Sequence, residues 1–420
     1  MTKTTTAHAS ERGAVLVHVA LALLALMAFS TFVIDYGVLW TARRQAQNAA
    51  DAAALAGAVA LAFDNPSDFS NSGPAKTSAY QVVMSHPVWG QQPVVNITTD
   101  ITFPACPDDA SSNCIRVDVY RDASHGNPLP TIFGQLVGLG QQGVRAMAIA
   151  KVAVANSTDC LKPWAVVDKW EERWPLPPVA WTPNSVYDKY IKVGGNIIVD
   201  PSIIEPDRYI APTTSSTGTG FFPFNPDKSY SVDYGRQLML KVGDQNDFQF
   251  VGGWFGALSL GGAGGKTYKE NIKGCVGITY KIGDDLQFST EPGEKVGPSK
   301  QAVADEPQGD ADSLFNQDPT AYWDAAMNGG RGGVAGSAFS VSPRIVAVPL
   351  INPEAVVYAN QNGRTTVPIS NIMGFFVEGW DDANKAIVGR LVTTAGLLQV
   401  GGGGTVGPQS GFLQAIILVR

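Results

Sequence analysis

The four cysteines are the side chains whose spacing most directly predicts chemistry. No two of them form a C-x-x-C pair, so we do not expect a zinc site. An even number of cysteines fits disulfide bonds in a chain that leaves the cytoplasm. Cys106 and Cys114 bracket a short polar loop and suit a local bridge, which leaves Cys160 and Cys275 for a long-range bridge. The alternative is that all four are unpaired buried thiols.

Residues for acid–base or metal chemistry are sparse and poorly placed. None of the four histidines lies beyond His125, so the rest of the chain cannot by itself supply a Ser-His-Asp triad or a His-ligated metal. Glu171 and Glu172 are adjacent, and adjacent side chains diverge on a helix or strand, which makes them poor glycosidase candidates. We therefore expect no catalytic residue, no cofactor and no metal ion.

Three stretches resemble binding motifs only in part. The glycine-rich stretch 261–267 has Leu260 where a phosphate-binding loop needs its first glycine, so a glycine hairpin loop is the better interpretation. Residues 310–318 and 380–385 offer oxygen ligands without the full spacing or the closing glutamate of a calcium loop. We expect all three stretches to be loops.

The composition limits the partners of the chain. A net charge of -7 and only 30 Lys and Arg residues argue against nucleic acid, because phosphate binding needs a clustered basic surface. The 45 glycines and 27 prolines favour turns and loops over long soluble helices. At 420 residues the chain is long enough for two or three domains.

A long apolar segment stands near the amino terminus. Residues 14–34 contain only His18, Ser30 and Thr31 as polar members, and a helix of this length spans about 30 Å, the thickness of the hydrocarbon layer. Basic residues lie on both sides, so charge does not orient the segment. The cysteines favour an amino terminus inside and a carboxyl-terminal bulk outside, in the periplasm.

Two processing events compete with a permanent anchor. A secretory signal could be cleaved after residues 28–30, although the apolar run continues beyond them. A prepilin-type leader would need an acidic residue at the fifth position after Gly13, where the chain has His18. We therefore expect the anchor to be retained.

An alanine-rich helix follows the apolar segment and should end near Phe63, before the helix breakers of residues 64–74. Small or apolar residues recur in it with the a/d spacing of a helix-packing seam. Such a seam lets another helix approach closely, so we expect a related subunit or a second copy to pack there. The alternative is a solitary stalk made of the best helix former. The seam positions are Leu39, Ala42, Ala46, Ala49, Ala53, Ala56 and Ala60.

The run from Glu11 to Leu61 resembles the amino-terminal segment of TadE/TadG-type Flp pilus-assembly proteins. That family has a glycine before an apolar helix, an aspartate as the helix leaves the membrane, and a glutamine followed by an AADAAALAGA run. The matching positions here are Gly13, Asp35, Gln47 and, within the alanine run, Asp51. The resemblance implies a TadG-like structural component of a Flp pilus assembly or secretion apparatus.

One further pattern is connected with this family. Residues 68–72 match the D-x-S-x-S metal pattern of the von Willebrand A domains that many TadG proteins carry. In this chain the pattern follows the alanine-rich helix rather than a buried strand, so we interpret it as a turn. We expect no von Willebrand A domain.

The remaining chain predicts two domains outside the membrane. A helix at 75–86, strands at 94–103, 115–122 and 143–155, and an amphipathic turn at 127–140 indicate a small α+β domain. Short apolar runs between turn residues then indicate a β-rich domain. We expect an α+β fold organised as residues 1–12 in the cytoplasm, a transmembrane helix 13–34, a stem helix 35–63, an α+β domain 64–157 and a β-rich domain 158–420.

The sequence thus predicts an inner-membrane protein with a single membrane span, which serves as a scaffold outside the cytoplasm. Its expected partners are the membrane and related pilus-assembly subunits or a second copy; no nucleic acid and no small-molecule substrate are expected. The alternative is a membrane-tethered cell-envelope enzyme or carbohydrate-binding protein. Trp164, Trp170 and Trp174 raise that alternative because tryptophans stack on sugars, although packing in a core is commoner.

Overall fold

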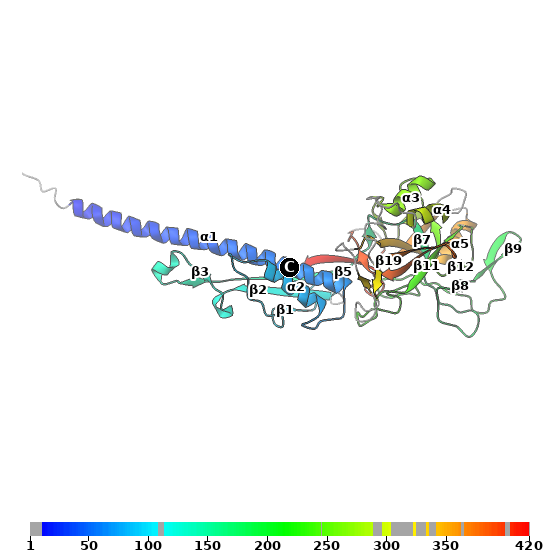
Figure 1. The fold of residues 1–420 in the computed structure, drawn as a ribbon, viewed down its shortest axis with the longest axis horizontal. Coiled ribbons are helices and arrows are strands. Elements are labelled where there is room, and N and C mark those ends of the chain that lie inside the picture. Colours follow the sequence, from blue (N-terminus) through cyan, green and yellow to red (C-terminus); the bar gives the residue numbers. More distant parts are fainter. Residues whose placement is uncertain are drawn as a thin grey trace, which may run out of the picture.

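The fold of the chain is a long helix followed by two β-sheet regions, which confirms the predicted α+β class (Figure 1). The computed structural model describes residues 11–107, 113–244, 246–288, 296–303, 322–324, 333–335, 342–362, 365–399 and 404–419.

Helix α1 (Glu11–Phe63) is continuous through the predicted change from membrane span to stem helix. It contains a segment long and apolar enough to cross a membrane, with mean hydropathy 2.3, and the side chains of this segment are exposed. The helix ends where predicted, because the amides of Asp64 and Asn65 both bond back to the carbonyl of Ala60 and Pro66 follows. One rigid element therefore leads from the apolar segment into the folded domain.

The small domain, as we call it, consists of the carboxyl-terminal half of α1, helix α2 (Pro74–Ser85) and a five-stranded sheet. The strand order is β1-β2-β5-β22-β21, and α1 packs on β5, β2 and α2. Short elements extend from it: η1 (Ala123–His125), β3 (Leu129–Pro130), η2 (Gly134–Val137) and β4 (Gln141–Gln142). The sheet strands are β1 (Ile101–Thr102), β2 (Asn113–Arg121), β5 (Val144–Val154), β21 (Thr394–Ala395) and β22 (Leu413–Val419).

The predicted strand at 94–103 is mostly a turn. Asp100 accepts a hydrogen bond from the Asn96 amide at 2.8 Å, and its own amide donates to the Asn96 carbonyl at 2.9 Å. Only Ile101–Thr102 remains as strand β1. The alternation of apolar and polar residues was a weaker signal here than the turn preference of Asn and Asp.

The last strand of the chain returns to the small domain. β22 runs antiparallel to β5, with Ala415 opposite Ala153 and Ile416 opposite Val152. Residues 158–420 are therefore not a separate unit in their hydrogen bonding, because β21 and β22 complete the sheet that β5 begins. The β-rich domain is an insertion between β5 and β22. Pairing with β22 also covers the edge of β5, which would otherwise be free.

The β-rich domain is built on a seven-stranded sheet in the order β15-β19-β18-β7-β13-β11-β20. β19 also pairs with β20, so the strands from β19 to β20 close into a barrel. Alternate residues serve two cores: Val346, Val348 and Leu350 lie in one, and Ala347 and Ile351 in the other. The strands are β7 (Trp164–Val167), β11 (Gln237–Gly243), β13 (Trp254–Ala257), β15 (Asp285–Gln287), β18 (Ile345–Ile351), β19 (Thr366–Asp381) and β20 (Ala386–Val392).

Helices and small ribbons surround this barrel. The helices are α3 (Gly265–Lys273), α4 (Val296–Val303) and α5 (Pro353–Gln361). The ribbons pair β8 with β12, β9 with β10, β6 with β14 and β16 with β17. Their bounds are β6 (Ser157–Thr158), β8 (Val186–Tyr187), β9 (Tyr190–Val193), β10 (Asn196–Val199), β12 (Phe250–Val251), β14 (Tyr280–Lys281), β16 (Tyr322–Asp324) and β17 (Gly333–Ala335).

The structure contains both expected disulfides. Cys106 is bonded to Cys114 in the small domain, and Cys160 to Cys275 in the β-rich domain. Next to the second bridge, the buried Lys162 ammonium donates to the carbonyls of Ile272 at 2.8 Å and Gly274 at 2.6 Å. The bridge and the lysine together hold the end of α3 against the start of β7.

Gly57 lies where three elements of the small domain meet. A Cβ atom there would stand 2.4 Å from Ile115 Cδ1 on β2, 3.1 Å from the Ala75 carbonyl on α2 and 3.2 Å from Ala79 Cβ. Gly37, in the same helix, has no described atom within 4 Å of the equivalent position. The two glycines thus form a matched pair that differs in packing.

We predict that Gly57→Ala destabilises the small domain and Gly37→Ala does not. Overpacking costs about 1–3 kcal/mol, which exceeds the roughly 1 kcal/mol that alanine gains over glycine in a helix. Denaturant unfolding of the detergent-solubilised protein measures both. Equal stability of the two variants would show that α1 does not approach α2 and β2 this closely.

Candidate functional site: the contact between the stem helix and the small domain

The alanine face of the stem helix (residues 35–63 of α1) is filled by the chain itself. Ala46, Ala49 and Ala53 are fully buried, and Leu39 and Ala56 are partly buried. Their neighbours are β5, β2 and α2. A second subunit cannot reach the buried part of the predicted seam in this structure, so a contact with another subunit must use a different surface. The other buried seam residues are Ala42 and Ala60.

Asp35 attaches a loop to α1 at the point where the apolar segment ends. Its carboxylate accepts hydrogen bonds from three consecutive backbone amides: Ile132 at 2.7 Å, Phe133 at 3.2 Å and Gly134 at 2.6 Å. Gln142 Nε2 also donates to the Asp35 carbonyl at 3.2 Å. Successive amides form a concave site that suits an anion, and the Asp35 side chain is only 7 % exposed. We call residues 129–142 the Asp35 loop.

A further family-motif position, Gln47, also joins the stem helix to the small domain, and Asp51 accepts a hydrogen bond from it. Gln47 Nε2 donates to the Met147 carbonyl on β5 at 3.0 Å and to Asp51 Oδ1 at 2.7 Å. Nearby, Gln45 Oε1 accepts from the Trp89 amide at 2.7 Å. Polar side chains at the border of the alanine face thus fix the register of α1 on the sheet. Gly13, at the other end of the motif, has no described atom near its Cβ position.

The tryptophans of the β-rich domain lie mostly in its core. Trp164 and Trp170 are buried and Trp174 is half-buried. Trp170 packs edge-on against Trp181 and Tyr187, and its indole nitrogen donates to Glu172 at 3.2 Å. Trp164 and Trp170 therefore cannot stack on a sugar in this structure.

Carboxyl groups gather beside this aromatic cluster. Burial and the neighbouring charge of Asp207 raise the pKa of Asp188 to about 6, and burial raises the pKa of Asp207. Asp207 accepts hydrogen bonds from the amide of Arg173 at 2.7 Å and from that of Trp174 at 3.3 Å. Asp207 therefore holds the backbone at Arg173 and Trp174 in place, which gives this carboxyl group a structural role.

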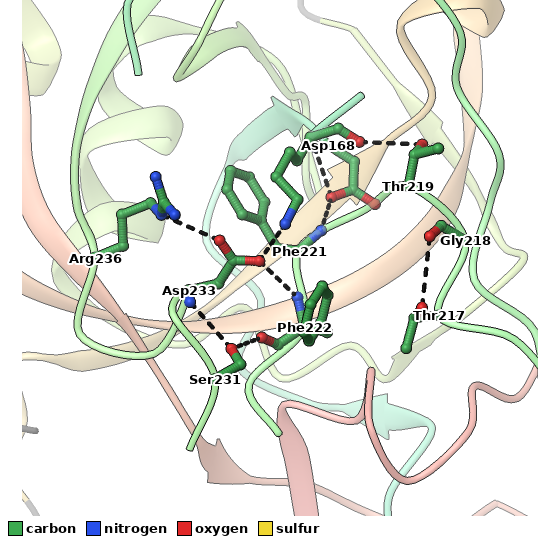
Figure 2. Close-up of polar contacts among 10 residues, drawn as sticks. Asp168, Thr217, Gly218, Thr219, Phe221, Phe222, Ser231, Asp233 and Arg236 are labelled. Atoms are coloured by element: carbon green, nitrogen blue, oxygen red, sulfur yellow. Dashed lines mark hydrogen bonds and ion pairs between the residues drawn. The ribbon is translucent and has the colours of Figure 1, made fainter. Parts of the chain in front are cut away.

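A buried polar network joins the loop 217–236 to Asp168 and Lys169, which directly follow β7 (Figure 2). Asp168 accepts from the amides of Phe221 and Lys169, both at 2.8 Å, and from the Tyr209 hydroxyl at 2.9 Å. Asp233 forms ion pairs with Lys169 and with Arg236. Both carboxylates are bonded by the protein itself, so the network has a structural explanation.

A cavity of about 360 Å³ lies where the end of α1 meets the β-rich domain. Lys228 Nζ crosses this junction and donates to Asn113 Oδ1 on β2 at 2.8 Å. The Tyr230 hydroxyl similarly donates to the Asp64 carbonyl at 3.4 Å. The lining includes Ala62, Val154, Phe224, Ser410 and Gln414. The hydrogen bonds of Lys228 and Tyr230 hold the two domains together beside the β5–β22 pair.

The motif-like stretches have ordinary roles. Residues 261–264 precede α3 rather than forming a hairpin, and Lys266 in its first turn lies 3.8 Å from Glu270. Asp68 accepts from the Ser70 amide in a turn, and Asp381 closes the β19–β20 hairpin. Residues 310–318 lie outside the described part. Within the described ranges no group of three His, Cys, Asp or Glu side chains could hold a metal.

We predict that Asp35→Ala releases the Asp35 loop. Three amides then lose their acceptor, which should cost about 1–3 kcal/mol. Hydrogen exchange of the Ile132, Phe133 and Gly134 amides should accelerate in the solubilised protein. Asp51→Ala is the control, because it removes an acceptor on the same helix without touching the loop. Unchanged exchange in the Asp35 variant would contradict the contact.

A second prediction concerns pH. Burial raises the pKa of Asp168 from 3.8 to about 6, so the folded protein holds a proton that the unfolded chain has lost. Asp168 should therefore lower the free energy of unfolding as the pH rises from about 4 to about 6, by roughly 3 kcal/mol. Asp168→Asn should remove this contribution and make the fall smaller, and the part that remains is due to groups such as Asp188, whose pKa is also raised to about 6.

Denaturant unfolding at several pH values measures the effect. Asp381→Asn, on the exposed hairpin where hydrogen bonds to Asn384 and Ala383 lower the pKa of Asp381, is the control and should leave the fall in place. If the free energy of unfolding changes with pH in the same way in the Asp168 variant and the unaltered protein, the raised pKa of Asp168 would be refuted.

Comparison with known proteins finds a family that helix α1 resembles. Residues 13–60 match the family model described as Flp pilus-assembly TadE/G-like. The match covers the apolar part of α1, Asp35, Gln47, Asp51 and the alanine face up to Ala60. Searches of curated proteins and of solved structures found no match to the chain. Over residues 13–60 the chain is therefore similar to the TadE/G-like Flp pilus-assembly family.

Proposed function

We propose that this chain is an inner-membrane protein with a single membrane span and serves as a scaffold of a Flp/Tad-type pilus assembly or secretion apparatus. The observation that carries the proposal is the continuity of α1. Its apolar part is exposed as a membrane segment would be, and its alanine part is a core element of the small domain. Both parts lie in the segment that matches the pilus-assembly family.

A scaffold must hold its outer domains at a fixed position relative to the membrane. The helix has no break between residues 11 and 63, and two adjacent strands, β5 and β22, lead from the small domain to the barrel. A single flexible linker would let the domains move relative to the membrane. The two disulfides support a periplasmic location for both domains.

Partner subunits would bind to surfaces that the fold leaves open. The alanine face is occupied from Ala42 to Ala60, so we expect contacts with related subunits or a second copy through the outer domains or through the exposed apolar part of α1. The alternative of a tethered enzyme or carbohydrate-binding protein is not supported by the tryptophans, since Trp164 and Trp170 are buried.

An insertion experiment distinguishes a scaffold from a tethered enzyme. A flexible linker of about ten Gly and Ser residues placed between Ile34 and Asp35 keeps both the anchor and the domain but uncouples them. We predict that this variant loses surface pili in the bacterium that encodes the chain, while the protein stays in the membrane fraction. The matched control is the same linker between Gly194 and Gly195, in an exposed turn with no described atom near either Cβ position.

The control should keep normal pili. Normal pili with the insertion after Ile34 would contradict the scaffold and favour a tethered enzyme or binding protein. Release of the unaltered chain from membranes by alkaline extraction would contradict the anchor itself.

A further inference from the structure

We propose that the Asp35 loop is a second membrane contact, which lies in the lipid headgroup layer beside α1 on the side where the folded domains stand. The inference rests on the proposed membrane anchor and goes beyond it. It assigns a lipid surface as the partner of a part of the small domain.

The first argument is position. Asp35 directly follows the apolar segment 14–34, and its carboxylate holds the amides of Ile132 and Gly134. The loop is therefore fixed at the level where the helix leaves the hydrocarbon layer. In Figure 1 the part of the small domain that carries β3 extends furthest along α1 toward the amino-terminal end of the helix.

The second argument is the chemistry of the loop. Residues 127–143 contain no Asp, Glu, Lys or Arg. Ile132 is 55 % exposed and Leu139 is 64 % exposed, although both are large apolar side chains. Contiguous exposed apolar surface on a protein marks a contact with a protein or a membrane. Continuity with the anchor selects the membrane here.

The third argument is the matching surface of the helix. Tyr36 and Trp40 are both more than half exposed just beyond the apolar segment, where aromatic side chains typically mark the membrane interface. Trp40 lies about 9 Å beyond Ile34 along the helix at the usual rise per residue. Apart from the buried Asp35 carboxylate, a belt without charged side chains therefore runs across both the helix and the loop.

Arginines follow this belt on both elements. Arg43 and Arg44 come next on α1, and the Arg44 guanidinium lies 6.0 Å from the Trp40 ring centroid. Arg145, at the start of β5, forms an ion pair with Asp118 at 2.9 Å, is 56 % exposed and lines a groove together with Arg43. Cations at this height suit lipid phosphates. Along α1, apolar residues are followed by aromatic residues and then by arginines. This order matches the hydrocarbon, interface and phosphate layers of one lipid leaflet.

The test uses the full chain in vesicles of phosphatidylethanolamine and phosphatidylglycerol. All four native cysteines are in disulfides, so single cysteines can be introduced and spin-labelled. The labels replace Ile132 and Leu139 in the loop, and Leu24 within the anchor. Ile204, which is 77 % exposed in the β-rich domain, is the matched apolar control. Collisions with a water-soluble nickel complex and with oxygen report depth.

We expect labels at Ile132 and Leu139 to collide less with nickel and more with oxygen than the label at Ile204 does. Both collision rates should lie between those at Ile204 and those at Leu24. Labels at Ile132 and Leu139 that collide with nickel as Ile204 does, with Leu24 protected, would overturn this proposal and leave the anchor intact. Nickel collisions at Leu24 as well would overturn the anchor. Protection of the loop labels without oxygen collisions would indicate a protein partner and also overturn the lipid contact.

Discussion

The close packing of the alanine face of α1 on strand β5 and helix α2 is the contact on which the rest of the structure depends. Alanine side chains let the helix lie nearly against the sheet, and Gly57 allows α1, α2 and β2 to meet at one point. Because the helix that carries the apolar segment is also a core element, the small domain cannot rotate freely about that segment. The polar contacts of Asp35, Gln45 and Gln47 then fix its register.

The same packing explains how the β-rich domain is held. β5 lies under α1 and pairs with β22, the strand that returns from the barrel. The barrel is therefore joined to the small domain by two hydrogen-bonded strands, and side-chain contacts of Lys228 and Tyr230 support the junction. Helix, sheet and barrel form a continuous path from the apolar segment outward.

Local patterns predicted much of this fold from the sequence. Helical periodicity and breaker residues indicate α1 and its end at Phe63, and the spacing of the cysteines indicates both bridges. What packs on the alanine seam could not be predicted, because small residues indicate close approach without naming the neighbour. The pairing of β22 depends on a strand far away in sequence. The role of Asp35 depends on backbone amides, which have no sequence signature.

The most direct test of the central claim, that the stem helix is a core element of its own chain, is thiol reactivity in the detergent-solubilised monomer. Single cysteines would replace Ala46 and Ala53, which are fully buried, and Asn48, which is exposed on the same helix. The structure predicts that the thiols at 46 and 53 react far more slowly than the thiol at 48. Equal reactivity in the monomer, with protection of 46 and 53 only after another subunit binds, would contradict the claim.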